Sequence, residues 1–232
     1  MSCWLSLLFC LVTVLTAHAE KTPARTCRIL FLNGPDSAPD TLHLFDGTRS
    51  QEVDLPRMNL SKVYELPTGP LTLRLLDKPV TGPKLLPTDA PSATVAETML
   101  DLYLLVTSVS TDPSSPLRIQ IISANNDQLR SGQMLWFNLS DQDIGGVVGS
   151  QKLLLRAQSR QVMEAPASKN EGYAVNLSYR RDGSDSLYPL CETKWQHDPR
   201  SRSLAFVIKE NGARTPRVMV FPDYREAPEE KP

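Results

Sequence analysis

The sequence predicts an all-β protein made of two tandem immunoglobulin-like β-sandwich domains that follow an N-terminal signal peptide. Three observations support this prediction: an apolar N-terminal segment, short β-rich runs separated by turn residues, and a strand pattern that recurs after about 100 residues. They predict a signal peptide at 1–19, domains at 26–124 and 132–224, and a disordered tail at 225–232, which is rich in Glu and Pro.

The N-terminal segment has the pattern of an export signal. Residues 5–15 form an apolar run too short to span a bilayer comfortably, and Ala17 and Ala19 are small side chains that a signal peptidase accepts. We expect cleavage after Ala19 and export to the periplasm, the cell surface or the medium. The absence of Lys and Arg from residues 1–4 keeps an uncleaved anchor or a buried N-terminal segment open as the alternative. No other segment is apolar for long enough to cross a membrane, so we expect no stable membrane insertion after the signal is removed.

Short runs of β-branched and aliphatic residues alternate with turn clusters along the rest of the chain. The Pro-rich stretch 78–91 is expected to be a loop, and 93–106 is ambiguous between helix and strand, with strand favoured by its C-terminal part. The expected strands are 28–33, 41–45, 51–55, 62–66, 71–76, 102–109 and 117–123 in the first half, and 151–156, 160–164, 173–179 and 188–194 in the second.

The second half of the chain repeats the layout of the first. Three strands recur at offsets of 105, 101 and 99 residues: 29–33 with 134–138, 104–106 with 205–207, and 118–122 with 217–221. A period near 100 residues with about seven strands is the size of an immunoglobulin-like sandwich. We therefore expect two such units, joined around 124–132.

The opening of the first domain carries a motif pattern. A strand ends at Asn33 and is followed by Gly-Pro-Asp-Ser-Ala-Pro, a second strand at 41–45 and Asp-Gly; a Leu-Pro-Thr-Gly turn and a further strand follow at 66–74. This order resembles a β-sandwich domain of unknown function found in exported bacterial proteins. The resemblance covers about 50 residues of the 232. It implies a sandwich fold and export. It implies no catalytic activity, because the shared motifs are turn sequences.

The charge balance argues against a polyanion as the partner. The chain has 25 basic and 26 acidic residues, a formal net charge of -1, and no run of either sign. Nucleic-acid binding proteins normally carry a basic patch or stripe. We therefore expect a protein or glycan partner and no nucleic acid.

Only two cysteines, Cys27 and Cys191, remain once the signal is removed. An exported pair can oxidise, and a bridge between them would join the two halves of the chain. The alternative is two separate buried thiols, since cysteine is often a small core residue. The spacing alone does not decide between the two.

No catalytic residue, metal site or cofactor is predicted. His43 lies in an alternating strand and is expected to face away from its apolar neighbours. Cys191 and His197 share a short segment but lack the second His and the Met of a copper site. Asp141 and Asp143 offer oxygens at alternating positions, yet a solvated turn explains them without calcium.

Aromatic residues are the better candidates for binding. Trp136 lies in a nearly continuous apolar strand and is expected in the core. Trp195 and His197 have polar neighbours, so we predict them as an exposed contact. Three Asn-Leu-Ser sequons, at Asn59, Asn138 and Asn176, are further candidate surface positions whose use depends on the source.

The sequence therefore favours a non-catalytic binding module of the cell envelope. One alternative is a structural envelope component that assembles through exposed sheet edges, and another is an exported hydrolase or metal-binding protein. A clustered aromatic patch at one end of a sandwich would favour the first hypothesis, and a long uncapped edge strand the second.

Overall fold

The computed structural model describes residues 24–108, 117–181, 186–210 and 212–224. The segments predicted as signal peptide and C-terminal tail lie outside these residues. The described part is built of strands, apart from the short 3-10 helix η1 (Pro83–Leu85). Within that part, no helix has the length and apolar character needed to cross a bilayer.

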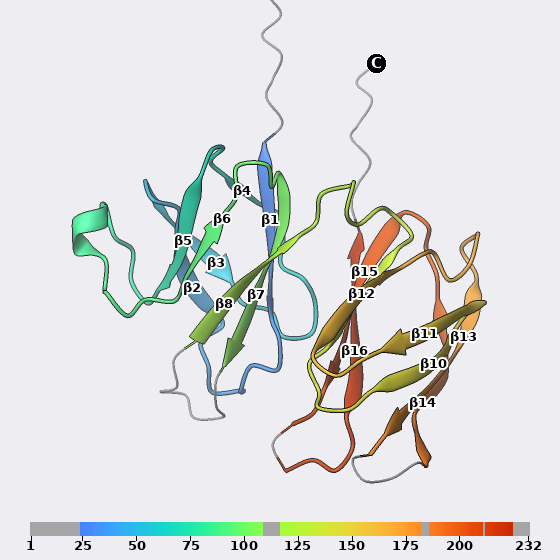
Figure 1. The fold of residues 1–232 in the computed structure, drawn as a ribbon. Coiled ribbons are helices and arrows are strands. Elements are labelled where there is room, and N and C mark those ends of the chain that lie inside the picture. Colours follow the sequence, from blue (N-terminus) through green and yellow to red (C-terminus); the bar gives the residue numbers. More distant parts are fainter. Residues whose placement is uncertain (1–23, 109–116, 182–185, 211, 225–232) are drawn as a thin grey trace, which may run out of the picture.

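The first repeat folds as a sandwich of two four-stranded sheets (Figure 1). Sheet A has the order β4-β1-β7-β8 and sheet B the order β3-β2-β5-β6. The strands are β1 (Arg25–Phe31), β2 (Thr41–Phe45), β3 (Ser50–Asp54), β4 (Tyr64–Leu66), β5 (Leu71–Leu76), β6 (Ser92–Val95), β7 (Asp101–Ser108) and β8 (Leu117–Ser123). We call this sandwich domain 1.

The second repeat forms another sandwich of two four-stranded sheets, domain 2. Sheet C has the order β12-β9-β15-β16 and sheet D the order β11-β10-β13-β14. The strands are β9 (Met134–Asn138), β10 (Ile144–Val148), β11 (Gln151–Leu155), β12 (Ser159–Met163), β13 (Gly172–Arg180), β14 (Leu187–Gln196), β15 (Ser201–Ile208) and β16 (Arg217–Tyr224). The prediction of two tandem β-sandwiches is confirmed.

The predicted repeat is visible in the strand pairing. β1 pairs in parallel with β7, and β9 pairs in parallel with β15; β8 and β16 then add antiparallel at the same edge. The three segment pairs that recur in the sequence thus lie in equivalent strands. Each described repeat has eight strands, one more than the seven expected, because β6 and β10 were not anticipated.

β10 was missed because two glycines interrupt its pattern. Gly145 and Gly146 lie inside the strand, and only Gly149 occupies the turn before β11, with a φ of 60°. A Cβ at Gly146 would lie 2.0 Å from the Asn176 carbonyl oxygen, so the close approach of β13 requires glycine there.

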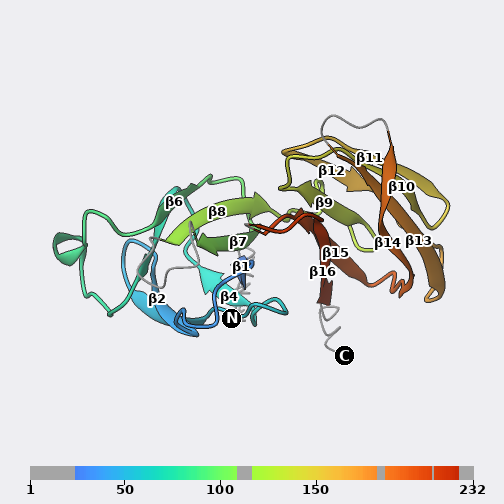
Figure 2. The same ribbon diagram turned by 90° about the horizontal axis from the view of Figure 1, so that it is seen from below.

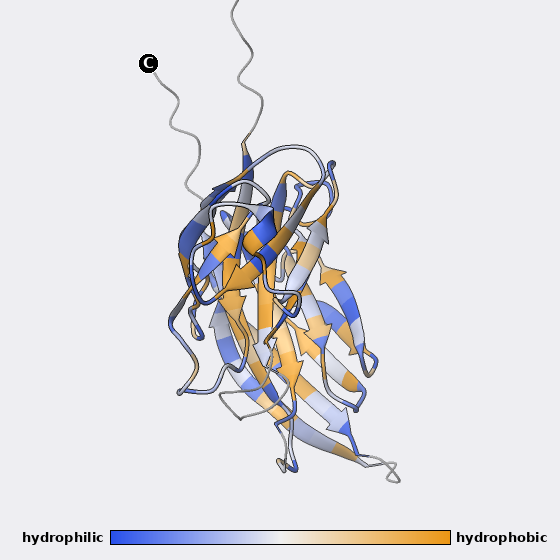
Figure 3. Ribbon diagram, turned by 90° about the vertical axis from the view of Figure 1, so that its left-hand side faces the viewer, coloured by the Kyte–Doolittle hydropathy of each residue, from blue (hydrophilic) through white to orange (hydrophobic). Residues whose placement is uncertain are grey.

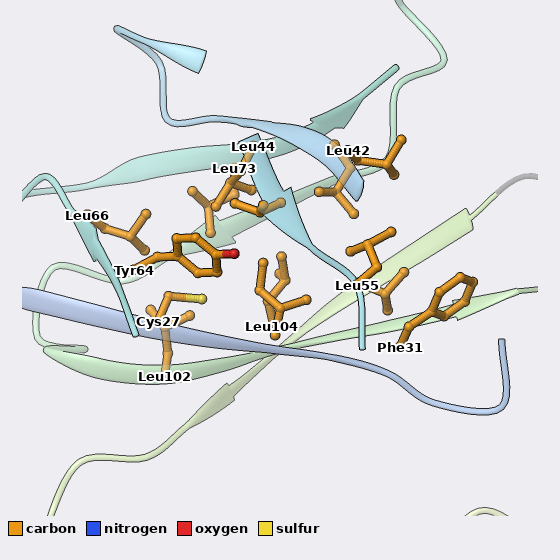
Figure 4. Close-up of a cluster of buried hydrophobic side chains, with 14 of the residues drawn as sticks. Cys27, Phe31, Leu42, Leu44, Leu55, Tyr64, Leu66, Leu73, Leu102 and Leu104 are labelled. Carbon is orange, nitrogen blue, oxygen red and sulfur yellow. The ribbon is translucent and has the colours of Figure 1, made fainter. Parts of the chain in front are cut away.

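The core of domain 1 lies between sheets A and B. Leu44 and Leu73 of sheet B meet Ile29 and Leu104 of sheet A, and all four side chains are fully buried. Figure 4 shows Leu44, Leu73 and Leu104 converging, with Cys27 and Tyr64 at one end of the cluster. The alternation of β2 places Leu42 and Leu44 inward and leaves His43 half-buried on the other face.

A third apolar core joins the two domains. Sheets A and C face each other, so their central strands are buried on both sides, and these strands show as largely orange ribbons in Figure 3. Equivalent positions of the two repeats belong to this cluster: Leu30 and Leu135, Leu105 and Phe206, Ile122 and Phe221. The order of layers is B, A, C, D, and the two sandwiches lie side by side in Figure 2. The same face of each repeat therefore contacts the other repeat.

Charged residues complete the interface. Asp223 is fully buried and accepts hydrogen bonds from the Tyr103 hydroxyl at 2.6 Å and from Arg202 Nε at 3.0 Å. Arg28 pairs with Asp223 at 2.9 Å, and Arg202 also pairs with Asp101. Because both domains supply these groups, the network fixes how the domains are placed against each other.

Candidate functional site

The candidate site lies on the open side of domain 2, which we define as the gap between the edge strands β14 and β16. Each of these strands is hydrogen-bonded to one neighbour only, β14 to β13 and β16 to β15. A cleft of about 250 Å³ lies between them. Its lining includes Tyr173, Trp195 and Gln196 from sheet D and Val218, Val220 and Tyr224 from sheet C.

The inward side chains of the two edge strands cover the domain 2 core incompletely. Trp195 and Cys191 of β14 and Val218 and Val220 of β16 pack against the buried core, yet each stays half-buried. Thr193 pairs with the buried Val175, so it faces inward, and it is nevertheless exposed. The open side is therefore a surface at which apolar core residues reach solvent.

Trp195 forms the aromatic floor of the cleft. Its ring stacks on the fully buried Trp136, with centroids 6.0 Å apart and an interplanar angle of 19°. The edge of Tyr173 meets Trp195 at 6.3 Å and 86°. These contacts hold the indole in one orientation and leave part of it accessible, which is the arrangement of a preformed aromatic contact. Trp136 thus lies in the core, as expected.

His197 does not form an exposed contact with Trp195, so that part of the prediction is wrong. The side chain is only 5% exposed and lies edge-on to Tyr173 at 6.4 Å. Its backbone N–H donates to the Glu171 carbonyl at 2.9 Å. The reason is strand alternation: positions 195 and 197 fall on one face, whereas the polar neighbours Lys194 and Gln196 project to the other.

Burial also sets the protonation of two groups near the cleft. It raises the pKa of the Tyr173 hydroxyl to about 12, so the phenol stays neutral. It raises the pKa of the Cys191 thiol as well, which disfavours the nucleophilic thiolate. These side chains therefore offer polarisable surface and hydrogen bonding instead of a ready nucleophile.

The far end of the open side is basic and aromatic. The Arg181 guanidinium lies 4.5 Å from the centroid of the Tyr188 ring, and that ring contacts Tyr179 at 5.6 Å. Hydrogen bonds with Thr215 and Arg181 lower the pKa of the Tyr179 hydroxyl. Trp195 and Arg181 thus mark opposite ends of β14.

The two cysteines are far apart in the fold and are not bonded to each other. Cys27 is buried in the core of domain 1, on sheet A, whereas Cys191 lies on sheet D of domain 2. Sheet C separates these sheets, so the structure corresponds to the alternative of two separate thiols. Cys191 lies within β14 and His197 directly after it, and no group of three metal-ligating side chains in the described residues includes them.

The other candidate residues have structural partners. Asp141 pairs with Lys209 at 3.0 Å, and Asp143 accepts a hydrogen bond from the Ala157 N–H at 2.9 Å. Within the described ranges, no three His, Cys, Asp or Glu side chains gather closely enough to hold a metal ion. Asn138 is fully buried, so its sequon is inaccessible in the folded chain, whereas Asn59 and Asn176 are exposed.

Sequence reasoning found Trp195 but missed the cleft itself. Tyr224 and the valines of β16 stand far from Trp195 in the sequence, and only the pairing of sheets brings them together. The one available signal was the run Arg217 to Tyr224, an alternating edge strand with apolar side chains on both faces. In comparisons with known proteins, no family model matches this chain and no curated protein matches it.

Proposed function

We propose that the chain is an exported, non-catalytic binding module of the cell envelope that takes up its partner at the open side of domain 2. The observation that supports this proposal most directly is the half-buried Trp195, held by Trp136 and Tyr173 at the floor of a cleft between two edge strands. Export rests on the predicted signal peptide at 1–19.

The chemistry of the cleft favours binding over catalysis. Its walls are mainly aromatic and aliphatic. Burial raises the pKa of the Tyr173 hydroxyl to about 12, so this group stays protonated at neutral pH. Tryptophan and tyrosine are the residues most enriched where binding energy concentrates in interfaces. Ser203 adds a hydroxyl to the lining that can hydrogen-bond a partner, whereas Gln196 Nε2 already donates to Asn170 and the Ser201 hydroxyl to the Asp198 carbonyl.

A rigid mounting supports the same proposal. Arg28 of domain 1 donates a hydrogen bond to the Tyr224 carbonyl at 3.0 Å and pairs with the adjacent Asp223. The interdomain network thus holds one wall of the cleft in place. A preorganised wall lowers the entropic cost of binding a partner.

A second candidate function is assembly of a structural envelope component through sheet edges. The ten-residue β14 favours it, because a long edge strand can pair with another copy of the chain. Self-association is what separates the two candidates. Analytical ultracentrifugation of residues 20–232 should give a monomer for the binding module and concentration-dependent oligomers for the structural component.

The main test is a pull-down from the native envelope fraction with the chain from residue 20 onward, read by mass spectrometry. We expect one enriched partner, retained by the control Met58→Ala and lost with Trp195→Ala and Tyr224→Ala. Met58 is an exposed apolar residue of domain 1, and Tyr224 is 56% exposed, so neither truncation opens a core. Equal capture by the cleft variants, or no enriched partner, would contradict the proposal.

A further inference from the structure

We infer that the partner enters the open side of domain 2 as an extended segment that adds antiparallel to β14, with an acidic C-terminal end next to Arg181. This inference rests on the proposed binding function and names the kind of partner that the site takes. Three features carry it: the uncovered core, the unpaired edge of β14, and the charge at one end of that edge.

The first feature is the uncovered core. The half-buried apolar residues around the domain 2 core all come from the two edge strands that border the gap. They are Tyr188, Leu190, Cys191 and Trp195 on β14 and Val218 and Val220 on β16. A strand added at the free edge of β14 would place every second side chain on the same face as the β14 members of this set, because side chains alternate between the two faces of a strand.

The second feature is the backbone of β14. Since β13 occupies one side only, alternate residues of β14 direct their N–H and C=O groups toward the gap. Pro189 lacks an N–H, and the register shifts opposite Leu177 and Ser178, so the regular part of this edge begins at Cys191. The segment from Cys191 to Gln196 is therefore the template for the added strand.

The two repeats differ at this edge, which points to a role specific to domain 2. The equivalent edge strand of domain 1 is β6, with four residues, whereas β14 has ten. β6 follows the Pro-rich loop that carries η1, and β14 follows the long strand β13. The repeat has thus been extended in domain 2 at the side where the core is open.

Charge complementarity determines the direction of the added strand. An antiparallel segment starts beside Trp195 and ends beside Tyr188, where the Arg181 guanidinium lies over the aromatic ring. Arg181 forms no ion pair with an acidic residue of the described part of the chain. A carboxylate at the C-terminal end of the segment would meet this guanidinium in a charge-assisted contact.

The probe for this inference is a displayed library of nine-residue segments with Val, Leu, Ile or Phe at alternate positions. Half of the library ends in Asp and half in Lys. We expect the chain from residue 20 onward to enrich Asp-ended segments over Lys-ended ones by about tenfold or more, which corresponds to about 1.4 kcal/mol. Arg181→Glu should reverse this preference, and Arg118→Glu, an exposed position on β8, should leave it unchanged.

Hydrogen exchange of the complex provides the structural readout. Alternate amides in the segment from Cys191 to Gln196, those that face away from β13, should exchange more slowly once the best library member is bound, because an added strand accepts their hydrogen bonds. No enrichment, enrichment that ignores the terminal charge, or unchanged exchange in β14 would each overturn the inference. If the envelope partner still depends on Trp195 in that case, the binding function stands and only the added strand fails.

Discussion

Asp101 and Arg202 occupy equivalent positions in the two repeats and form an ion pair with each other across the domain interface. The offset of 101 residues that aligns Leu104 with Ala205 also aligns this pair. If two identical repeats packed by the same face, a charged residue near the symmetry axis would lie next to its own copy, and the two like charges would repel each other. Opposite charges at position 101 and its equivalent make the contact attractive and favour pairing of domain 1 with domain 2.

Replacing Arg202 tests the interface network. Arg202→Met should lower the free energy of unfolding by about 3 kcal/mol, because it removes one of the two cations beside the buried Asp223 and takes the Arg202 donor away from the Ala124 and Leu129 carbonyls. Urea denaturation followed by tryptophan fluorescence would measure the loss. Lys152→Met, an exposed position on β11, is the control and should change stability by less than about 0.5 kcal/mol. A loss below about 1 kcal/mol for Arg202→Met would show that the network contributes little.

The fold was largely predictable because most strands carry their own signal. β5 and β8 match their expected bounds, and the last three residues of β1 and the first four of β9 are continuous apolar runs. Such runs are typical of strands buried on both faces. The interface between sheets A and C was in principle visible in these runs, yet a sequence does not tell which second layer covers them. β6, a short polar strand of Ser, Ala, Thr and Val, carried too little pattern to be recognised.

The candidate site was less predictable because it depends on contacts between distant strands. Polar neighbours suggested that His197 was exposed, but His197 directly follows β14, and its side chain lies on the inner face beside Tyr173. Nothing in the local sequence marks Arg202 and Asp223 as buried, and only the packing of two domains buries them. A local sequence pattern predicts on which face of a strand a side chain lies. Whether that face packs against another sheet depends on contacts between distant segments.

Asn138 should be a strong determinant of stability. Its Nδ2 donates to the carbonyls of Gln142, Leu155 and Arg156, and its Oδ1 accepts from Ser140. Asn138→Ala would leave buried carbonyls without donors, so we expect a loss of about 3 kcal/mol in the free energy of unfolding.

Asn176→Ala is the matched control for this change, since it removes the same side chain from an exposed position of another sequon. It should be nearly neutral. Chemical denaturation of both variants at pH 7 provides the comparison, and equal effects would contradict the assigned role of Asn138.

Asp46 should link stability to acid pH. Burial alone would raise the pKa of its carboxyl. Hydrogen bonds from Arg49 and Thr48 lower the pKa by a larger amount, so the net shift is downward. A lowered folded-state pKa means that the carboxylate stabilises the fold above the unfolded pKa of about 3.9, and that this contribution is lost as pH falls through the folded value.

The variant Asp46→Ala should therefore lose about 1–2 kcal/mol at pH 7, and its difference from the original chain should shrink as the pH falls below about 4. Thermal unfolding at a series of pH values measures this difference. Asp89→Asn, in an exposed loop, should follow the original chain throughout. A difference that stays constant over the acid range would rule out the linkage.

Cys191 should react slowly with alkylating reagents despite being half-buried. Burial disfavours its thiolate and raises the pKa of the thiol above the ordinary 9.0, and only the thiolate attacks iodoacetamide. At pH 8 the alkylation rate should fall below that of free cysteine, and it should keep rising with pH beyond the point where the free thiol levels off. Mass spectrometry of digests measures the rate at this site, with Cys191→Ser as the blank and Cys27, fully buried, reacting only after denaturation. Alkylation of Cys191 as fast as free cysteine, or a non-reduced peptide that joins it to Cys27, would contradict the separate, burial-protected thiols that the structure shows.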